Sequence, residues 1–287
     1  MSDNTKIEWT DATWNPITGC SVKSPGCKNC YAMNLAGTRM KSHPSRAGLT
    51  IMSAAGPVWN GEVRFNEQWL DQPLLWSRPR SIFVCAHSDL FHEHVPDKWI
   101  DRVFEIMGRA HWHVFQVLTK RSDRMRAYME RRVERGFAVY SHVWLGVSAE
   151  DQERADERIV DLMHTPASVR WLSAEPLLNA VRIAALMHPN GVTRLDWVVV
   201  GGESSRPAAR ARPMNPQWAR DLRDECAELR IPYLFKQWGE WVSVSEVAGE
   251  GPHHTFGDGR TVRRVGKKLA GRMLDGVQHD GYPEAHA

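Results

Sequence analysis

Between residues 81 and 235 the chain alternates short apolar runs with longer amphipathic or charged stretches. The runs are apolar throughout, which is typical of parallel strands that are buried on both faces. Their starts lie about 26 to 36 residues apart, which is the length of a repeating strand-helix unit. The runs are Ser81 to Ala86, His113 to Leu118, Val143 to Val147, Val169 to Leu172, Asp196 to Val200 and Pro232 to Phe235. This pattern predicts an α/β fold built as an incomplete parallel (β/α) barrel.

Helix signals lie between these runs. Pro96 is expected to open one helix, and Ser122 to cap a strongly charged one that Gly136 ends. Asn215 followed by Pro216 predicts the start of a further helix, because proline suits the first helical position.

The chain before residue 81 is less regular. Residues 15 to 19 predict a short first strand, and residues 31 to 41 a helix. Residues 42 to 80 are rich in Gly, Pro and Trp, which predicts an irregular insertion. We therefore expect a barrel domain over residues 1 to 240, with the insertion at about 42 to 80, and a basic C-terminal extension over residues 241 to 287 that packs on it.

Each predicted strand is followed within three residues by polar or ionisable side chains. In a parallel barrel the carboxyl ends of all strands lie on one rim, where such folds place their chemistry. The plainer alternative is that strand ends are exposed and therefore polar. The candidates are Ser88, Asp89, Lys120, Arg121, Ser148, Glu150, Glu175, Glu203 and Lys236.

Three cysteines follow the predicted first strand in the spacing C-x6-C-x2-C: Cys20, Cys27 and Cys30. The chain has five cysteines, and an odd number with three close together indicates a metal site in a reducing compartment. Three thiolates are one ligand short of a closed tetrahedral site. A four-iron cluster with one open iron therefore fits this loop best.

Structural zinc stays open as an alternative. His87, His92 or His94 would supply its fourth ligand, but the paired C-x2-C arrangement that would favour zinc is absent from the sequence. Cys85 and Cys226 lie in apolar surroundings and are expected to be core residues.

Composition sets outer limits on function. The 287 residues are 42% hydrophobic and 25% charged, which is enough to bury a full core. The N-terminus has no apolar stretch of a signal peptide, and no run approaches the roughly 18 to 20 apolar residues of a membrane span. We expect a cytoplasmic protein. The net charge of +3 permits a nucleic-acid partner.

Two further features bear on such a partner. Residues 260 to 272 hold six basic side chains and no acidic one. Of the 13 tryptophans, several lie outside the predicted elements and would be suited to stack on bases: Trp9, Trp59, Trp238 and Trp241. Core packing is the alternative use of tryptophan.

A three-cysteine loop ahead of repeated strand-helix units resembles the radical S-adenosylmethionine (SAM) superfamily. More closely, the chain is similar to the phage-associated Gp37/Gp68-type three-cysteine-motif family from residue 7 to about residue 276. The segments that carry this resemblance are 7 to 16, 19 to 31, 88 to 92, 117 to 121, 173 to 178, 200 to 204, 235 to 241 and 265 to 272. The x6 gap departs from the superfamily's usual C-x3-C-x2-C spacing.

The resemblance implies a radical-SAM/TIM-like barrel with a [4Fe-4S] cluster on Cys20, Cys27 and Cys30. The open iron would bind SAM, and one electron would cleave SAM to methionine and a 5'-deoxyadenosyl radical that abstracts hydrogen from a substrate. An electron donor such as flavodoxin or ferredoxin is implied as a partner, and the setting is the cytosol of a phage host or bacterium.

Positions on the predicted rim suggest roles around SAM. Ser88 and Asp89 are candidates for the methionine amino group. Lys120 or Arg121 would meet its carboxylate, and Ser148 or Glu150 the ribose. Superfamily members often hold the amino group with a Gly-Gly-Glu after the second strand. Here that motif, residues 201 to 203, follows a much later strand, so the role is not transferred to it.

Glu175, Glu203 and Lys236 follow later strands and are the candidate catalytic residues. A carboxylate would orient a substrate amine or hydroxyl, and Lys236 would pair with a carboxylate or phosphate. The alternative is that Glu203 and Lys236 form a simple ion pair. The basic extension and the phage resemblance favour a nucleic-acid base as substrate, as in DNA modification or repair. A zinc- or cluster-stabilised nucleic-acid-binding protein without turnover is the alternative function.

Overall fold

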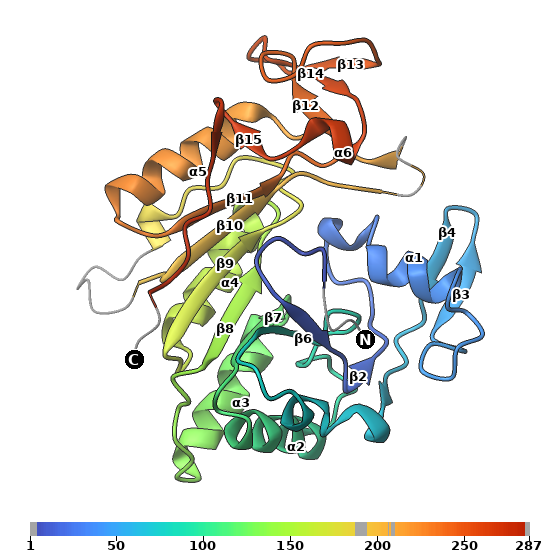
Figure 1. Ribbon diagram of the computed structural model, residues 1–287, viewed down its shortest axis with the longest axis vertical. Helices are drawn as coiled ribbons and strands as arrows, with labels where there is room; N and C mark the ends of the chain where they lie inside the picture. The colour runs from blue at the N-terminus through green and yellow to red at the C-terminus, as the bar shows by residue number, and fades with distance from the viewer. Residues whose placement is uncertain (1–4, 187–193, 206, 208–209, 285–287) are drawn as a thin grey trace. The chain divides into compact units, whose positions relative to one another are not determined.

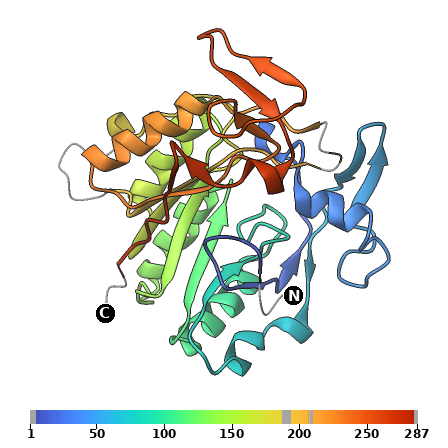
Figure 2. The same cartoon turned by 45° about the horizontal axis from the view of Figure 1, so that its top comes forward.

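The computed structural model describes residues 5–186, 194–205, 207 and 210–284 (Figures 1 and 2). It separates into two compact units. The first comprises residues 1–147 and 164–169, and the second residues 148–163 and 170–287. The seven strands of the main sheet follow the order β1-β6-β7-β8-β9-β10-β11. A parallel sheet with intervening helices confirms the predicted α/β class, and its strand order agrees with an incomplete parallel barrel.

The first unit contributes four of these strands, paired in parallel. They are β1 (Ala12–Trp14), β6 (Ser81–Val84), β7 (Val114–Thr119) and β8 (Val143–Ser148). Two helices connect the later strands, α2 (Asp97–Arg109) and α3 (Ser122–Glu134). These helices lie side by side (Figure 1), with the rings of Phe104 and Tyr128 5.5 Å apart.

The second unit contributes the other three strands, again paired in parallel. They are β9 (Val169–Ala174), β10 (Trp197–Gly201) and β11 (Tyr233–Gln237). Their helices are α4 (Gln152–His164) and α5 (Pro216–Glu228), and a short 3-10 turn, η4, covers Ala184–Leu186. Nearly every residue of these strands is buried, as expected for strands packed on both faces.

The predicted first strand at residues 15 to 19 is wrong in its bounds. The sheet strand is β1, and the next piece, β2 (Ile17–Thr18), pairs antiparallel with β5 (Arg64–Phe65). Pro16 lies between them and has no N–H to donate to a ladder, so the sheet strand ends before it.

The insertion contains more regular structure than its composition predicts. A hairpin of β3 (Thr50–Ser53) and β4 (Gly56–Trp59) packs on helix α1 (Tyr31–Gly37), which ends earlier than predicted. A Cβ at Gly37 would overlap Pro57, so glycine permits this close packing. The remaining turns are η1 (Pro25–Cys27), η2 (Glu67–Trp69) and η3 (Gln72–Leu75).

The predicted helix boundaries are mostly confirmed. The Asn215 side chain accepts the Gln217 N–H at 2.9 Å and caps α5, as expected. Pro96 precedes α2. Ser122, however, is the first helical residue of α3 and not its cap. Gly136 has φ of 83° and lies just past the end of α3, where the left-handed backbone favours glycine.

The chain after residue 240 forms small antiparallel elements in the second unit. Three strands pair in the order β12-β14-β13, followed by a short helix and a hairpin. They are β12 (Trp241–Ser243), β13 (His253–Thr255), β14 (Thr261–Arg264), α6 (Lys267–Ala270), β15 (Met273–Leu274) and β16 (Val277–Gln278). The chain then returns along β11, where Phe235 donates to the His279 carbonyl at 3.0 Å and Gly281 to the Tyr233 carbonyl at 2.9 Å.

Candidate functional site

The cysteine loop is shaped by its backbone. Gly19 has φ of 95°, and a Cβ there would overlap the Glu62 carbonyl, so only glycine fits before Cys20. Cys27 closes the turn η1, with its N–H donating to the Ser24 carbonyl at 2.9 Å. Cys30 lies directly before α1 and donates to the Cys27 carbonyl at 3.2 Å. A 3-10 turn and a helix start therefore hold the last two cysteines.

All three cysteines of the loop are free thiols and half-buried. Cys20 and Cys30 pack against a small apolar cluster from α1 and the insertion. Burial, reinforced by Asp89, raises the pKa of Cys20 to about 12, and burial also raises the pKa of Cys30. Cys20 and Cys30 therefore need a positive partner before they ionise, which a metal centre would supply.

Arg121 connects the end of β7 to this loop. Its Nη1 lies 3.8 Å from the Cys20 Sγ and 3.0 Å from the Asp89 Oδ2, and its Nη2 donates to the Ser21 Oγ at 2.6 Å. Its Nε donates to the Glu93 carboxylate. Burial opposes the charged form, yet these anionic neighbours hold the pKa of Arg121 above its ordinary value. The guanidinium is thus fixed as a cation beside Cys20.

Asp89 organises the β7 end in turn. Its Oδ1 accepts from the Thr119 hydroxyl at 2.7 Å and from the Phe91 N–H at 3.0 Å. Its Oδ2 accepts from the Lys120 N–H at 3.1 Å, in addition to Arg121. Both carboxylate oxygens therefore have two partners each, which supports a role in holding this turn.

Ser88 and Lys120 differ in how their side chains are used. The Ser88 hydroxyl donates to the Gly19 carbonyl at 2.6 Å and so attaches the cysteine loop to the end of β6. The Lys120 ammonium has no hydrogen-bonded or ion-paired partner among the described residues. It lies close enough to Cys30 to favour the Cys30 thiolate, although burial has the larger effect and raises the pKa of Cys30. Lys120 remains able to meet an anionic ligand.

The three histidines considered as zinc ligands have protein partners. His87 Nδ1 lies 2.5 Å from Arg46 Nη2, and His94 Nδ1 lies 2.9 Å from the Gly61 carbonyl. His92 Nε2 lies 3.0 Å from the Ser21 Oγ, and burial, with Arg121, lowers the pKa of His92 to about 4. The imidazoles brace the loop and its surroundings.

Within the described part of the chain, no three His, Cys, Asp or Glu side chains converge on a single metal ion. A cluster places each cysteine on a different iron, so its ligands need not converge on one point. Three free thiols on one loop, next to the fixed guanidinium of Arg121, fit a cluster by their chemistry.

In the second unit Glu175 and Lys236 form an ion pair, with Nζ 3.0 Å from Oε1. Ser173 donates to the other carboxylate oxygen at 3.3 Å. Gly201 gives this carboxylate room, since a Cβ there would lie 2.6 Å from Oε1. Both charged side chains are only 12% and 18% exposed, so this pair is well shielded from solvent.

Glu203, for which an ion pair with Lys236 was the alternative to a catalytic role, has an arginine partner. Glu203 is paired with Arg212, whose backbone N–H and Nε donate to Oε2 at 2.8 Å and 3.0 Å. The Arg212 Nη2 donates to the other oxygen. Two arginine donors and one backbone donor on a carboxylate that is 4% exposed favour a structural role for Glu203.

Ser148 and Glu150 also lie in a closed environment. Arg158 Nη1 donates to the Ser148 carbonyl at 2.7 Å and to the Glu150 Oε2 at 3.2 Å. The Glu150 carbonyl accepts from the N–H groups of Leu178 and Asn179 at 2.8 Å and 3.2 Å. Within the second unit these contacts join Ser148, α4 and the chain after β9, which gives Glu150 a supporting role.

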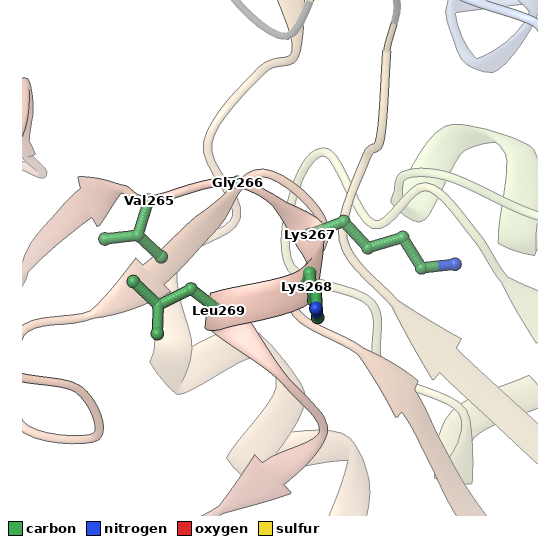
Figure 3. Close-up of a pocket in the computed structure, with 5 residues that line it drawn as sticks. All are labelled: Val265, Gly266, Lys267, Lys268 and Leu269. Carbon is green, nitrogen blue, oxygen red and sulfur yellow. The ribbon is translucent and has the colours of Figure 1, made fainter.

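The basic stretch at residues 260 to 272 is largely used inside the protein. Arg263 donates to the Val247 and Gly249 carbonyls, Arg264 lies over the Trp241 ring at 5.6 Å, and Arg260 and Arg272 pair with Asp258 and Asp280. Lys267 and Lys268 are exposed beside a depression of about 440 Å³, and Figure 3 shows their side chains extending in different directions from α6.

The four tryptophans considered for base stacking are core residues. Trp9, Trp59, Trp238 and Trp241 are at most 9% exposed. Trp238 and Trp241 also donate their ring N–H groups to the Met273 and Ala211 carbonyls. Their use in packing is therefore confirmed. Cys85 and Cys226 are buried, as expected.

Two residues of the site were missed by sequence reasoning. Ser21 and Glu93 each bind Arg121, and Ser21 also contacts His92. Ser21 follows Cys20 directly, and Glu93 lies between His92 and His94, so proximity to recognised motifs was the available signal.

The fold and these contacts define an α/β protein with a parallel sheet and a three-cysteine loop braced by the ends of β6 and β7. The chain belongs to the family described as protein of unknown function (DUF5131), whose model matches residues 4–283. Comparison with curated proteins and with solved structures gave no match. In the described ranges, every helix is too short or too polar to cross a membrane.

Proposed function

We propose that this protein is a radical SAM enzyme whose loop at Cys20, Cys27 and Cys30 holds a [4Fe-4S] cluster. The supporting observation is that three free thiols lie on one loop and that two cations from the end of β7 lie next to it. Arg121 contacts Cys20, and Lys120 lies near Cys30. When bound, the cluster would supply the electron that cleaves SAM to methionine and a 5'-deoxyadenosyl radical.

The contacts refine the proposed roles of the rim residues. Lys120 is the best candidate for the SAM carboxylate, because its ammonium has no competing partner among the described residues. Ser88, Asp89 and Arg121 are proposed to hold the cysteine loop, because each already bonds to it or to its neighbours. Glu150 and Ser148 are proposed to stabilise the end of the sheet and not to bind the ribose of SAM.

Glu175 and Lys236 remain the proposed substrate contacts. A shielded carboxylate and ammonium held 3.0 Å apart present opposite charges in fixed positions. Such a pair would orient a substrate that carries both a donor and an anionic group, and a nucleotide has both. Glu203 is not retained as a catalytic candidate, because Arg212 occupies both of its oxygens.

Anaerobic reconstitution with iron and sulfide tests the proposal. We expect a brown protein with absorbance at about 400 nm, as Fe–S proteins show. After reduction with dithionite and addition of SAM, it should release 5'-deoxyadenosine. Metal analysis of the protein as purified should show iron. A colourless protein with one zinc ion and no SAM cleavage would contradict the proposed enzyme activity.

That opposite outcome would support the alternative, a zinc- or cluster-stabilised nucleic-acid-binding protein without turnover. The observation in its favour is the exposed pair Lys267 and Lys268 beside the depression at α6. The same pair supports a nucleic-acid base as the substrate of the enzyme. Internal pairing of the neighbouring arginines reduces the basic surface that either function could use.

A further inference from the structure

Arg121 is the most heavily engaged side chain around the cysteine loop. Its three nitrogens contact Cys20, Ser21, Asp89 and Glu93, which come from the loop and from the chain after β6. The side chain is 5% exposed. A guanidinium with every nitrogen occupied and little accessible surface is poorly placed to bind a small anionic ligand.

We infer that Arg121 is the positioning residue of Cys20: it holds the Cys20–Ser21 segment against the end of β7 and directs a charged N–H at the Cys20 sulfur. The inference rests on the proposed cluster, for which Cys20 is a ligand. Arg121 then positions the cluster ligand Cys20, and Lys120 remains available to bind the carboxylate of SAM.

The planar guanidinium suits this task better than an ammonium. One edge reaches the Asp89 Oδ2 at 3.0 Å and the Cys20 Sγ at 3.8 Å through the same Nη1, while Nη2 reaches the Ser21 Oγ at 2.6 Å. Asp89 is itself fixed by Thr119 and the Phe91 N–H. The guanidinium therefore links the first cysteine to residues that are fixed at the ends of β6 and β7, which restrains the cysteine.

The charges around Cys20 give Arg121 a second effect. Arg121 Nη1 contacts both the Cys20 Sγ, at 3.8 Å, and the Asp89 Oδ2, at 3.0 Å. Without Arg121, the Asp89 carboxylate would lose its charged partner close to the Cys20 sulfur. A positive N–H donor at a cluster ligand stabilises the more negative, reduced state, so Arg121 is expected to raise the reduction potential.

Three variants separate these effects. Arg121→Gln removes the charge, and Arg121→Lys keeps the charge without the planar guanidinium. Arg131→Gln, from the helix α3 that Arg121 precedes, is the matched control, because Arg131 is 50% exposed and pairs with Asp97 away from the loop. If Arg121→Gln does not fold, as judged by circular dichroism, Ser21→Ala and Arg121→Lys carry the test.

The readouts are iron and sulfide content, iron loss to a chelator, and the midpoint potential from a redox titration followed by electron paramagnetic resonance. Arg121→Gln should lower the potential and lose iron on the order of 10-fold faster, the usual effect of removing a partner of a metal ligand. Arg121→Lys should have a reduction potential closer to wild type than that of Arg121→Gln, but it should also lose iron faster than wild type. Wild-type potential and iron retention in Arg121→Gln would overturn the inference.

Hydrogen exchange of the metal-free protein makes this test independent of the cluster. Exchange of residues 19 to 31 should be faster in Arg121→Gln than in wild type and Arg131→Gln. Wild-type protein that binds no iron would contradict the proposed function, whereas unchanged exchange in Arg121→Gln would contradict the positioning role.

Discussion

Arg158 donates to Glu150 across 3.2 Å, and the two side chains are 1% and 0% exposed. A buried charge that loses its partner is strongly destabilising. Arg158→Met should lower the free energy of unfolding by about 3 to 5 kcal/mol, measured by urea denaturation. Arg109→Met, which removes a 4.0 Å ion pair between exposed side chains, is the control and should change it by less than about 1 kcal/mol. Equal small effects would show that the buried pair is not essential to stability.

The cysteine loop predicts a clear separation among the five cysteines. Cys20→Ala, Cys27→Ala and Cys30→Ala should each abolish the cluster absorbance after reconstitution, because each removes a proposed iron ligand. Cys226→Ala, in the buried face of α5, is the control and should keep it. Full iron and sulfide in Cys27→Ala would refute the ligand assignment.

Lys120 is predicted to bind the carboxylate of SAM. Lys120→Met should raise the KM for SAM in 5'-deoxyadenosine release by roughly 10- to 100-fold, the cost of a charged hydrogen bond. Iron content should not change, since Lys120 is not a ligand. Lys98→Met, on the exposed side of α2, is the control. An unchanged KM in Lys120→Met would remove this role.

The half-buried His87 predicts a pH dependence of stability. Burial, together with Arg46, lowers the pKa of His87 to about 3 from an ordinary value of 6.5. The folded state therefore binds fewer protons than the unfolded state between these values, so the free energy of unfolding should fall as pH decreases below about 6.5. Urea denaturation at pH 7 and at about pH 5 measures this loss.

The slope should be smaller in His87→Gln, which cannot be protonated but still offers an acceptor to Arg46. Part of it should remain, because burial also lowers the pKa of His92, to about 4. An identical slope in wild type and His87→Gln would show that His87 does not contribute.

Exposed lysines at α6 predict a salt-dependent interaction with DNA. Lys267→Gln with Lys268→Gln should weaken binding and reduce the slope of log affinity against log salt by about 2, one for each phosphate that no longer meets a lysine. Lys98→Gln is the control. Arg272 is left unchanged because it pairs with Asp280. An unchanged slope would remove the main support for a nucleic-acid partner.

Local signals explain why much of the fold was predictable. The apolar runs at residues 81 to 235 correspond to β6 through β11 in the expected order, since strands buried on both faces must be apolar along their whole length. Asn215 and Pro216 start α5 because cap and first-turn chemistry are local. The three-residue β1 was missed because so short a strand has no periodicity, and its limit is set by Pro16.

The x6 gap between the first two cysteines is explained by the contacts of the residues within it. Ser21 is held by Arg121 and His92, and Ser24 begins the turn that ends at Cys27. The gap therefore provides both the attachment of the loop to the β7 end and the turn that brings the second cysteine back. The spacing alone indicates neither function.

The sequence by itself determined the α/β class, the succession of apolar strands and helices after residue 81, and the three-cysteine loop, because each depends on residues that are close together along the chain. Only the tertiary structure decided which polar residues act together: Lys236 pairs with Glu175, Glu203 with Arg212, and Arg121 with Asp89 beside Cys20. Such partnerships join residues up to 101 positions apart. They depend on which side chains are desolvated next to one another, and no local pattern carries that information.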